Sequence, residues 1–319
     1  MKLLSAPFFQ DIAKAPEGGE AFWITTEDRV RIRVAAWGKG NLGTVFLFPG
    51  RTEYVEKYGP PAAEFAARGY ATIVVDWRGQ GLADRPLPDR ETGHVSGFAD
   101  YQMDVAAVEA VARELGLPEP FFLVAHSMGG AIAFRSLIEG RPFRAAAFSA
   151  PMWGIKIAPT LRPVAWVLAA TSRRIGQAHR YAPGTGPVDL ERDYVFEGNT
   201  LTTDPEMFAF QRRQVEMYPE LALGGPSLHW LHEALRETRG LRALPSPEIP
   251  VLTALGTNER VVEPRNVHDR MQRWPKGRFN LFEGAEHEMM MERPEVRTEF
   301  YDQAAELFDL PSRVRSRAS

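Results

Sequence analysis

The chain has 319 residues, 44% of them hydrophobic, which is enough to bury the core of one large domain or of one domain with an insertion. With 38 Lys and Arg against 41 Asp and Glu, its formal charge of −3 lacks the basic footprint expected of a nucleic-acid binder. It has no cysteine, which excludes disulfides, a thiol nucleophile and thiolate zinc sites, and fits a reducing compartment. The N-terminal apolar stretch is short and interrupted by polar residues, and the longest apolar tract, near 164–170, is too short to span a bilayer, so we expect neither a signal peptide nor a membrane span. The expected location is the cytoplasm, including the inner face of a membrane.

Strand-like and helix-like segments alternate along the chain. Apolar and charged residues alternate over residues 22–37, which predicts an antiparallel hairpin that turns near Glu27 and Asp28. Unbroken apolar runs, typical of strands buried on both faces, follow at 44–48, 71–75, 121–125, 145–149, 251–255 and 279–282. Segments with helical spacing lie at 61–69, 98–115, 128–139, 267–274 and 296–307. The alternation predicts the α/β class, with a mostly parallel sheet covered by helices on both faces.

One long segment interrupts this alternation. Between Pro151 and Pro250 no apolar run has the character of a buried strand, and the segment instead carries scattered prolines and glycines, aromatic residues and helical fragments. We predict that residues 152–246 form a helical cap over the carboxyl ends of the strands, and that 1–151 and 247–319 form the core. The alternative is that the segment belongs to the main layers. The last residues, from Pro311 onward, are predicted to fray.

Ser127 occupies an unusual position between an apolar run and a helical segment. A sharp strand-to-helix turn there would lift its hydroxyl to the top of the sheet, and such a turn needs small residues two positions before and two after. Those residues are Ala125 and Gly129, one methyl group away from the G-x-S-x-G pattern. The sequence therefore predicts a nucleophilic serine. The alternative is a serine that only caps the helix.

A serine hydroxyl needs a base to accept its proton. His287 follows the last apolar run, in a loop at the carboxyl end of the sheet where ligands of such sheets bind. We interpret the remaining histidines as packing or surface residues: His94, His126, His179, His229, His232 and His268. His229 and His232 could share a helix face and bind a metal, but no third ligand is evident.

The acid and the oxyanion donors are predicted from loops that follow other strands. Glu259 is the first carboxylate after the run at 251–255, whereas its rival Glu263 suits the start of the next helix. The order serine, acid, histidine along the chain is the one found in α/β-hydrolases. An oxyanion would need two N–H donors, which we assign to the backbone of Met128 and of Arg51. The alternative for the loop of Arg51 is an ordinary Pro-Gly turn.

These residues lie in segments that resemble the α/β-hydrolase superfamily, and within it the monoacylglycerol lipase and bacterial lysophospholipase group. The matching segments are FPGRTEYVEKY (48–58), DWRGQGLADR (76–85), AHSMGG (125–130), NTLT (199–202), LGTNERVV (255–262) and GAEHEMMMERPEVR (284–297). The resemblance covers nearly the whole chain. It implies the α/β-hydrolase fold and a catalytic triad of Ser127, Glu259 and His287, with glutamate where aspartate is commoner.

The expected function is hydrolysis of carboxylic esters of single-chain lipids through an acyl-enzyme, with no metal and no cofactor. The expected partners are a small-molecule or lipid ester substrate and, transiently, a membrane surface, but no nucleic acid. Two alternatives are a peptidase that resembles proline iminopeptidases and a ligand-binding homologue without catalysis. The expected acyl-pocket residues are Trp153, Trp166, Met207, Phe208 and Met289, although core packing is the commoner role for each. Arginines that could face a phosphate or an anionic surface, or simply a solvated helix face, are 162, 173, 174, 212 and 213.

Overall fold

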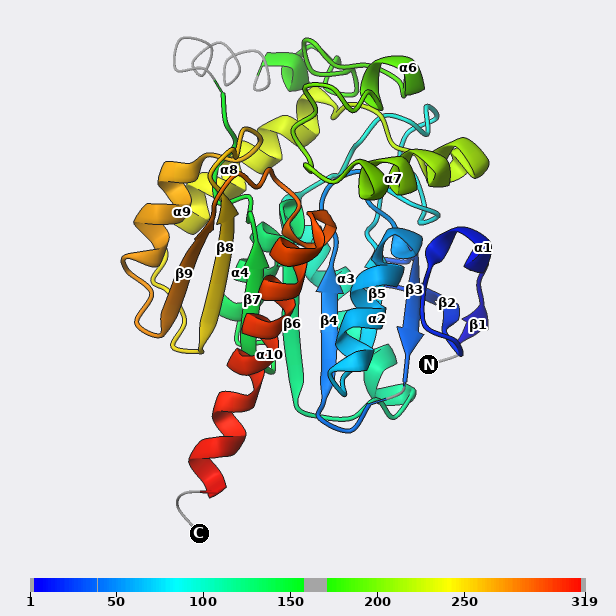
Figure 1. Cartoon of the computed structure of the whole chain (residues 1–319). Helices are drawn as coiled ribbons and strands as arrows, with labels where there is room; N and C mark the ends of the chain where they lie inside the picture. Colours follow the sequence, from blue (N-terminus) through cyan, green and yellow to red (C-terminus); the bar gives the residue numbers. More distant parts are fainter. Residues whose placement is uncertain (1–2, 39, 158–170, 317–319) are drawn as a thin grey trace.

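The computed structural model describes residues 3–38, 40–157 and 171–316, and a single sheet runs through them (Figure 1). The strands are β1 Leu4–Ser5, β2 Glu20–Thr25, β3 Arg31–Trp37, β4 Thr44–Phe48, β5 Ala71–Asp76, β6 Phe121–His126, β7 Phe143–Ser149, β8 Val251–Gly256 and β9 Gly277–Phe282. Their order in the sheet is β1-β2-β3-β5-β4-β6-β7-β8-β9. Strands β1, β2 and β3 pair antiparallel, as do β3 and β5, and the remaining pairs are parallel. The predicted hairpin, the six later strands and the mostly parallel sheet are confirmed.

Helices cover both faces of this sheet. They are α1 Gln10–Ala13, α2 Gly59–Ala67, α3 Tyr101–Glu114, α4 Met128–Ile138, α6 Leu190–Asp193, α7 Pro205–Met217, α8 Leu228–Ala243, α9 Pro264–Met271 and α10 Pro294–Ser316. Short 3₁₀ turns are η1 Val55–Tyr58, η2 Phe98–Asp100, η3 Pro219–Leu221 and η4 Met289–Met291. Within the described ranges, no helix is long and apolar enough to cross a membrane.

The two faces of the sheet bury alternate residues of the same strand. Val45 and Leu47 of β4 pack with α2 and α10, whereas Phe46 and Phe48 pack with α3 and α4 on the opposite face. Because side chains of a strand point to opposite faces in turn, an apolar run without alternation is required where helices cover both sides. This explains why unbroken runs marked the central strands in the sequence.

Two expectations about the end of the chain are wrong. The run in β9 does not form a strand buried on both faces: β9 is the last strand of the sheet, and Leu281 is 52% exposed. The predicted fray from Pro311 is also incorrect, because α10 continues to Ser316.

Helices α6, α7 and α8 lie between β7 and β8 in the chain (Figure 1). Figure 1 shows α6 and α7 beyond the carboxyl ends of the parallel strands. Helix α8 packs against α4, and Trp230, Ala234 and Leu241 join the same hydrophobic cluster as the sheet. The division of the chain at residues 152 and 246 stays a prediction.

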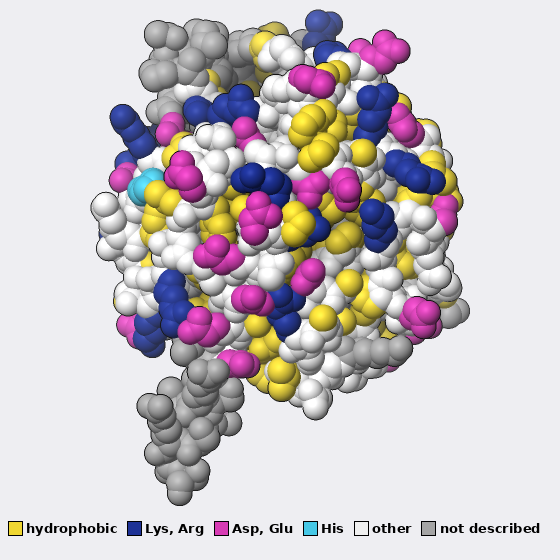
Figure 2. Space-filling model, viewed as in Figure 1, with side chains coloured by type: hydrophobic (Ala, Val, Ile, Leu, Met, Phe, Trp, Pro, Cys, Tyr) yellow, Lys and Arg dark blue, Asp and Glu magenta, His cyan; other side chains and the backbone are white. Residues whose placement is uncertain are grey.

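Charged side chains of both signs are interspersed on the face shown in Figure 2, with apolar side chains between them. This face therefore carries no extended basic patch of the kind that nucleic-acid binders use.

Candidate active site

Ser127 lies at the turn between β6 and α4 in a strained backbone conformation, with φ 47° and ψ −117°. Positive φ is uncommon for a residue with a side chain and often marks a functional site. A Cβ atom at Gly129 would collide with the carbonyl oxygen of Phe48, and one at Gly130 would collide with Pro151. The Ser127 side chain makes no capping hydrogen bond to α4, so the interpretation as a mere helix cap is not supported. The turn has the geometry expected of a nucleophile elbow.

His287 and Glu259 form a buried pair. The imidazole Nδ1 lies 2.7 Å from Glu259 Oε2, and Glu259 Oε1 accepts hydrogen bonds from the N–H groups of Val261 (2.6 Å) and Val262 (2.9 Å). Burial alone raises the pKa of Glu259, but the hydrogen bond and charge of His287 and the two N–H groups outweigh it, so the net pKa lies below the usual value. The carboxylate is therefore ionised at neutral pH, and its contact with Nδ1 orients the imidazole ring of His287.

The rival acid occupies a different position. Glu263 is the N-cap residue of α9, as the sequence predicted, and Glu259 is the carboxylate that contacts His287. His126 is buried with its Nδ1 3.0 Å from the carbonyl oxygen of Ser149, which matches a packing role. Burial lowers the pKa of His126 even though Glu53 acts in the opposite direction.

A cavity of about 470 Å³ brings the predicted residues together. Ser127, His287, Arg51 and Met128 all line it, and of the seven histidines only His126 and His287 do so. Within the described residues, no hydrogen bond joins the Ser127 hydroxyl to His287. Such bonds are often long before substrate binds.

The residues that carry the two expected oxyanion donors both line this cavity. Arg51 follows β4, and Met128 is the first residue of α4, where backbone N–H groups lack intrahelical acceptors. Among the residues that the structure describes, we find no hydrogen-bond acceptor for the backbone N–H of Arg51 or of Met128. Gln80, in the 76–85 segment, donates from Nε2 to the carbonyl oxygen of Gly50 at 2.8 Å and so holds the loop.

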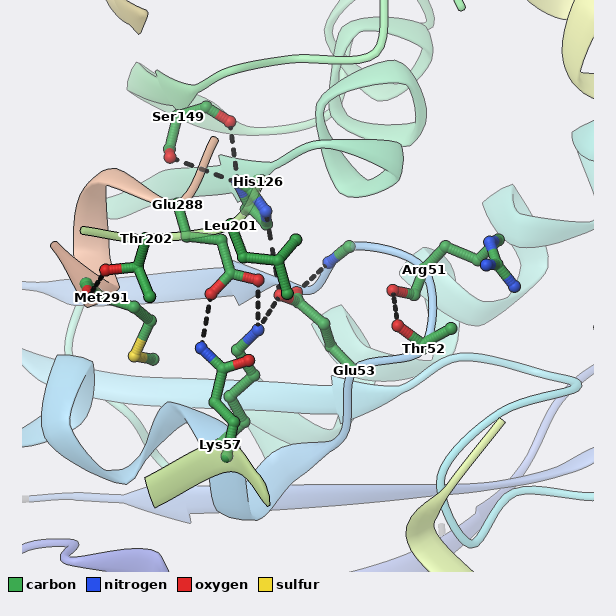
Figure 3. Close-up of polar contacts among 12 residues, drawn as sticks. Arg51, Thr52, Glu53, Lys57, His126, Ser149, Leu201, Thr202, Glu288 and Met291 are labelled. Carbon is green, nitrogen blue, oxygen red and sulfur yellow. Dashed lines mark hydrogen bonds and ion pairs between the residues drawn. The ribbon is translucent and has the colours of Figure 1, made fainter. Parts of the chain in front are cut away.

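A buried ionic cluster beside the site was not anticipated from the sequence (Figure 3). The Lys57 ammonium lies 2.7 Å from a carboxylate oxygen of Glu53 and 2.7 Å from one of Glu288. Glu53 also accepts a hydrogen bond from the backbone N–H of Gly50, and Glu288 directly follows His287. Lys57 therefore links the loop after β4 to the loop that carries the histidine. The only signal in the sequence was that Glu53 and Lys57 are four positions apart.

Glu53, Glu288 and His126 have the mutual spacing of a metal site. The Lys57 ammonium already lies between the two carboxylates, where it provides the positive charge that a metal would bring. Burial raises the pKa of Glu53, but the charges of Lys57 and His126 and the hydrogen bonds from Lys57 and Tyr58 outweigh it and lower the pKa to about 2. We therefore interpret the cluster as an internal ion pair rather than as a metal centre.

Replacing Lys57 with methionine should destabilise the fold by about 3–5 kcal/mol, because two buried carboxylates lose their counter-charge. The side chains of Lys57, Glu53 and Glu288 are only 5–6% exposed. Urea unfolding measures the change, with Arg278→Met as the control because its pair with Glu306 is about half exposed. Equal effects of the two substitutions would show that the cluster contributes no more than a surface pair.

The NTLT segment packs against the histidine loop. The backbone N–H of His287 donates to the carbonyl oxygen of Thr200 at 3.3 Å, and that of Glu288 donates to Leu201 at 2.8 Å. Asn199 orders the segment, because its Oδ1 accepts hydrogen bonds from the N–H groups of Leu201 and Thr202. Residues far from the triad in sequence thus fix the position of His287.

The expected acyl-pocket residues lie elsewhere. Trp153, Met207, Phe208 and Met289 are buried in hydrophobic packing and do not line the cavity, and Trp166 falls outside the described residues. The apolar side chains that do line it include Met152, Ile155, Leu201, Leu223, Trp230, Leu231, Val261 and Val262. Most of them come from loops, where apolar periodicity gives no signal.

The arginines singled out in the sequence are also absent from the cavity wall, as far as the structure describes them. Arg173 lies 3.7 Å from Glu233 and Arg212 lies 2.6 Å from Glu216. Arg174 and Arg213 are exposed, and Arg162 lies outside the described residues. The arginines that line the cavity are Arg51 and Arg192.

Comparisons with known proteins agree with this geometry. The Hydrolase_4 family, described as "Serine aminopeptidase, S33", matches residues 40–294. Lysophospholipase L2 of Escherichia coli K12 is 33% identical over 272 residues, covering 80% of this chain and 76% of that protein. A probable lysophospholipase L2 of Haemophilus influenzae is 29% identical over 255 residues, covering 79% of each.

The fold also matches solved structures. A soluble variant of monoglyceride lipase from Saccharomyces cerevisiae superposes with a TM-score of 0.69 at 18% identity, covering 90% of this chain and 94% of that one. A thermostable carboxyl esterase from Bacillus coagulans gives a TM-score of 0.72 at 14% identity, covering 92% and 99%. The chain therefore belongs to the α/β-hydrolase family, in the group of monoacylglycerol lipases and bacterial lysophospholipases, and is a carboxylic ester hydrolase.

Proposed function

We propose that this protein is a serine hydrolase that cleaves the ester of a single-chain lipid, a lysophospholipid or a monoacylglycerol, through an acyl-enzyme. The observation that carries the proposal is the strained turn of Ser127 on the same cavity as His287, whose imidazole contacts Glu259. The names of the relatives from Escherichia coli and Haemophilus influenzae support the substrate class. Residues 152–246 would form the cap over the acyl pocket.

The steps follow from the positions of these groups. The Ser127 hydroxyl attacks the ester carbonyl carbon while Nε2 of His287 takes its proton, and Glu259 stabilises the resulting imidazolium. The backbone N–H groups of Arg51 and Met128 stabilise the oxyanion. His287 then returns the proton to the leaving alcohol, and water attacks the acyl-enzyme by the same route. These steps require no metal and no cofactor.

A peptidase reaction is the second candidate, because the matching family is described as a serine aminopeptidase. A free amine in the substrate would need an unpaired carboxylate in the cavity. The carboxylates that line the described cavity are Glu53, Glu288 and Asp193. Lys57 pairs with the first two and Arg192 with Asp193 at 2.6 Å, which favours the ester over the aminoacyl substrate. A homologue without catalysis is not favoured, because all three triad residues are present.

The acyl chain should bind the apolar wall of the cavity, so kcat/KM is expected to rise with chain length by about fourfold per methylene until the wall is covered. The measurement is kcat/KM for p-nitrophenyl esters of increasing chain length, beside lysophosphatidylcholine, a monoacylglycerol and aminoacyl amides. A flat or falling dependence would contradict a lipid substrate. A preference for an aminoacyl amide would instead support the peptidase. Cytoplasmic location and transient membrane contact stay predictions.

A further inference from the structure

The Arg51 side chain extends from the oxyanion loop into the cavity, away from the Glu53–Lys57–Glu288 cluster (Figure 3). Its Nη1 donates to the carbonyl oxygen of Gly224 at 2.7 Å, and its guanidinium lies 5.8 Å from the ring centre of Trp230. Both contacts come from the segment between β7 and β8. These two contacts fix the position of the Arg51 side chain. The other N–H groups of the guanidinium remain available to a ligand in the cavity.

Arg51 differs from the other cations of the cavity in having no carboxylate partner. Lys57 lies between two glutamates, and Arg192 contacts Asp193. Within the described residues, no Asp or Glu forms an ion pair with Arg51. Burial lowers its pKa to about 10, against weaker opposing effects of Tyr101 and Tyr194, so the group is charged at neutral pH. A desolvated cation without a partner is a strong site for an anion.

We propose that the Arg51 guanidinium binds the phosphodiester of a lysophospholipid while its ester carbonyl lies at Ser127. The proposal rests on the ester hydrolase function and narrows its substrate class. The proposed mechanism assigns the backbone N–H of Arg51 to the oxyanion, and the guanidinium of the same residue lies one side-chain length from that N–H and also lines the cavity. In a lysophospholipid, a glycerol unit of comparable length separates the ester from the phosphate. The planar guanidinium suits two phosphate oxygens at once, whereas a monoacylglycerol offers it no charge.

The test compares lysophosphatidylcholine with a monoacylglycerol of the same acyl chain. Arg51→Met is expected to lower kcat/KM for lysophosphatidylcholine, relative to kcat/KM for the monoacylglycerol, by about 10- to 100-fold. The reason is that the substitution removes a hydrogen bond to a charged group only with the phospholipid. Arg51→Lys keeps the charge but not the planar fork, so an intermediate ratio is expected. Arg278→Met is the control, because this exposed arginine pairs with Glu306, does not line the cavity and should leave the ratio unchanged.

An equal fall for both substrates, or an unchanged ratio, would overturn the role of Arg51. If Arg51→Met turns over neither substrate, binding of lysophosphatidylcholine is measured by calorimetry to Ser127→Ala and to the double variant Ser127→Ala/Arg51→Met. Weaker binding to the double variant supports the proposal, and equal binding overturns it. Inhibition by glycerophosphocholine stronger than by inorganic phosphate supports a lipid headgroup, and the reverse order contradicts it. Absence of any ester hydrolysis by the unmodified protein would instead remove the proposed function.

Discussion

Replacing Ser127 with alanine is expected to lower kcat for ester hydrolysis by ~10⁴-fold or more, the loss that removal of a triad member causes. The hydroxyl is the only group at this turn that can attack the carbonyl carbon, and it makes no capping bond on which α4 depends. Alanine also keeps the small size that the turn requires. The measurement is kcat on a p-nitrophenyl ester, with thermal unfolding to confirm that the fold is intact.

A matched control is Ser5→Ala, which removes an exposed hydroxyl from β1 and should leave kcat unchanged. A folded Ser127→Ala protein that retained most of the activity would remove Ser127 from its assigned role.

Substitution of His287 by alanine is expected to reduce kcat to a similar extent, because it removes the base assigned to take the serine proton. The 2.7 Å contact with Glu259 orients the ring for this role. The measurement is kcat of the variant and of the unsubstituted protein on the same p-nitrophenyl ester, with thermal unfolding to confirm that the fold is intact.

His268→Ala is the comparison, because His268 lies on α9 and does not line the cavity. Inactivity of that variant together with activity of His287→Ala would show that the base was assigned to the wrong histidine.

The sequence predicted the sheet well because its central strands are covered on both faces. The run at 44–48 coincides with β4, and those at 121–125 and 251–255 fall one residue short of β6 and β8. Ser127 could be recognised because steric crowding at the turn demands small neighbours, which is a local property of the chain.

Contacts between distant segments were harder to predict. Lys57 meets Glu288 across 231 residues, and only the folded chain shows that the two share a buried site. The hydrogen bonds from His287 to Thr200 and from Arg51 to Gly224 likewise join loops whose order in space no periodicity encodes. For the same reason the acyl-pocket prediction chose large apolar residues, such as Trp153, that belong to the core.

The most direct test of the central claim is reaction of the protein with a fluorophosphonate, followed by mass spectrometry of the labelled peptide. We expect stoichiometric loss of esterase activity and a single phosphonylated residue, Ser127, with labelling greatly slowed in His287→Ala. An active protein that resists the reagent, or a label on a different residue, would contradict it.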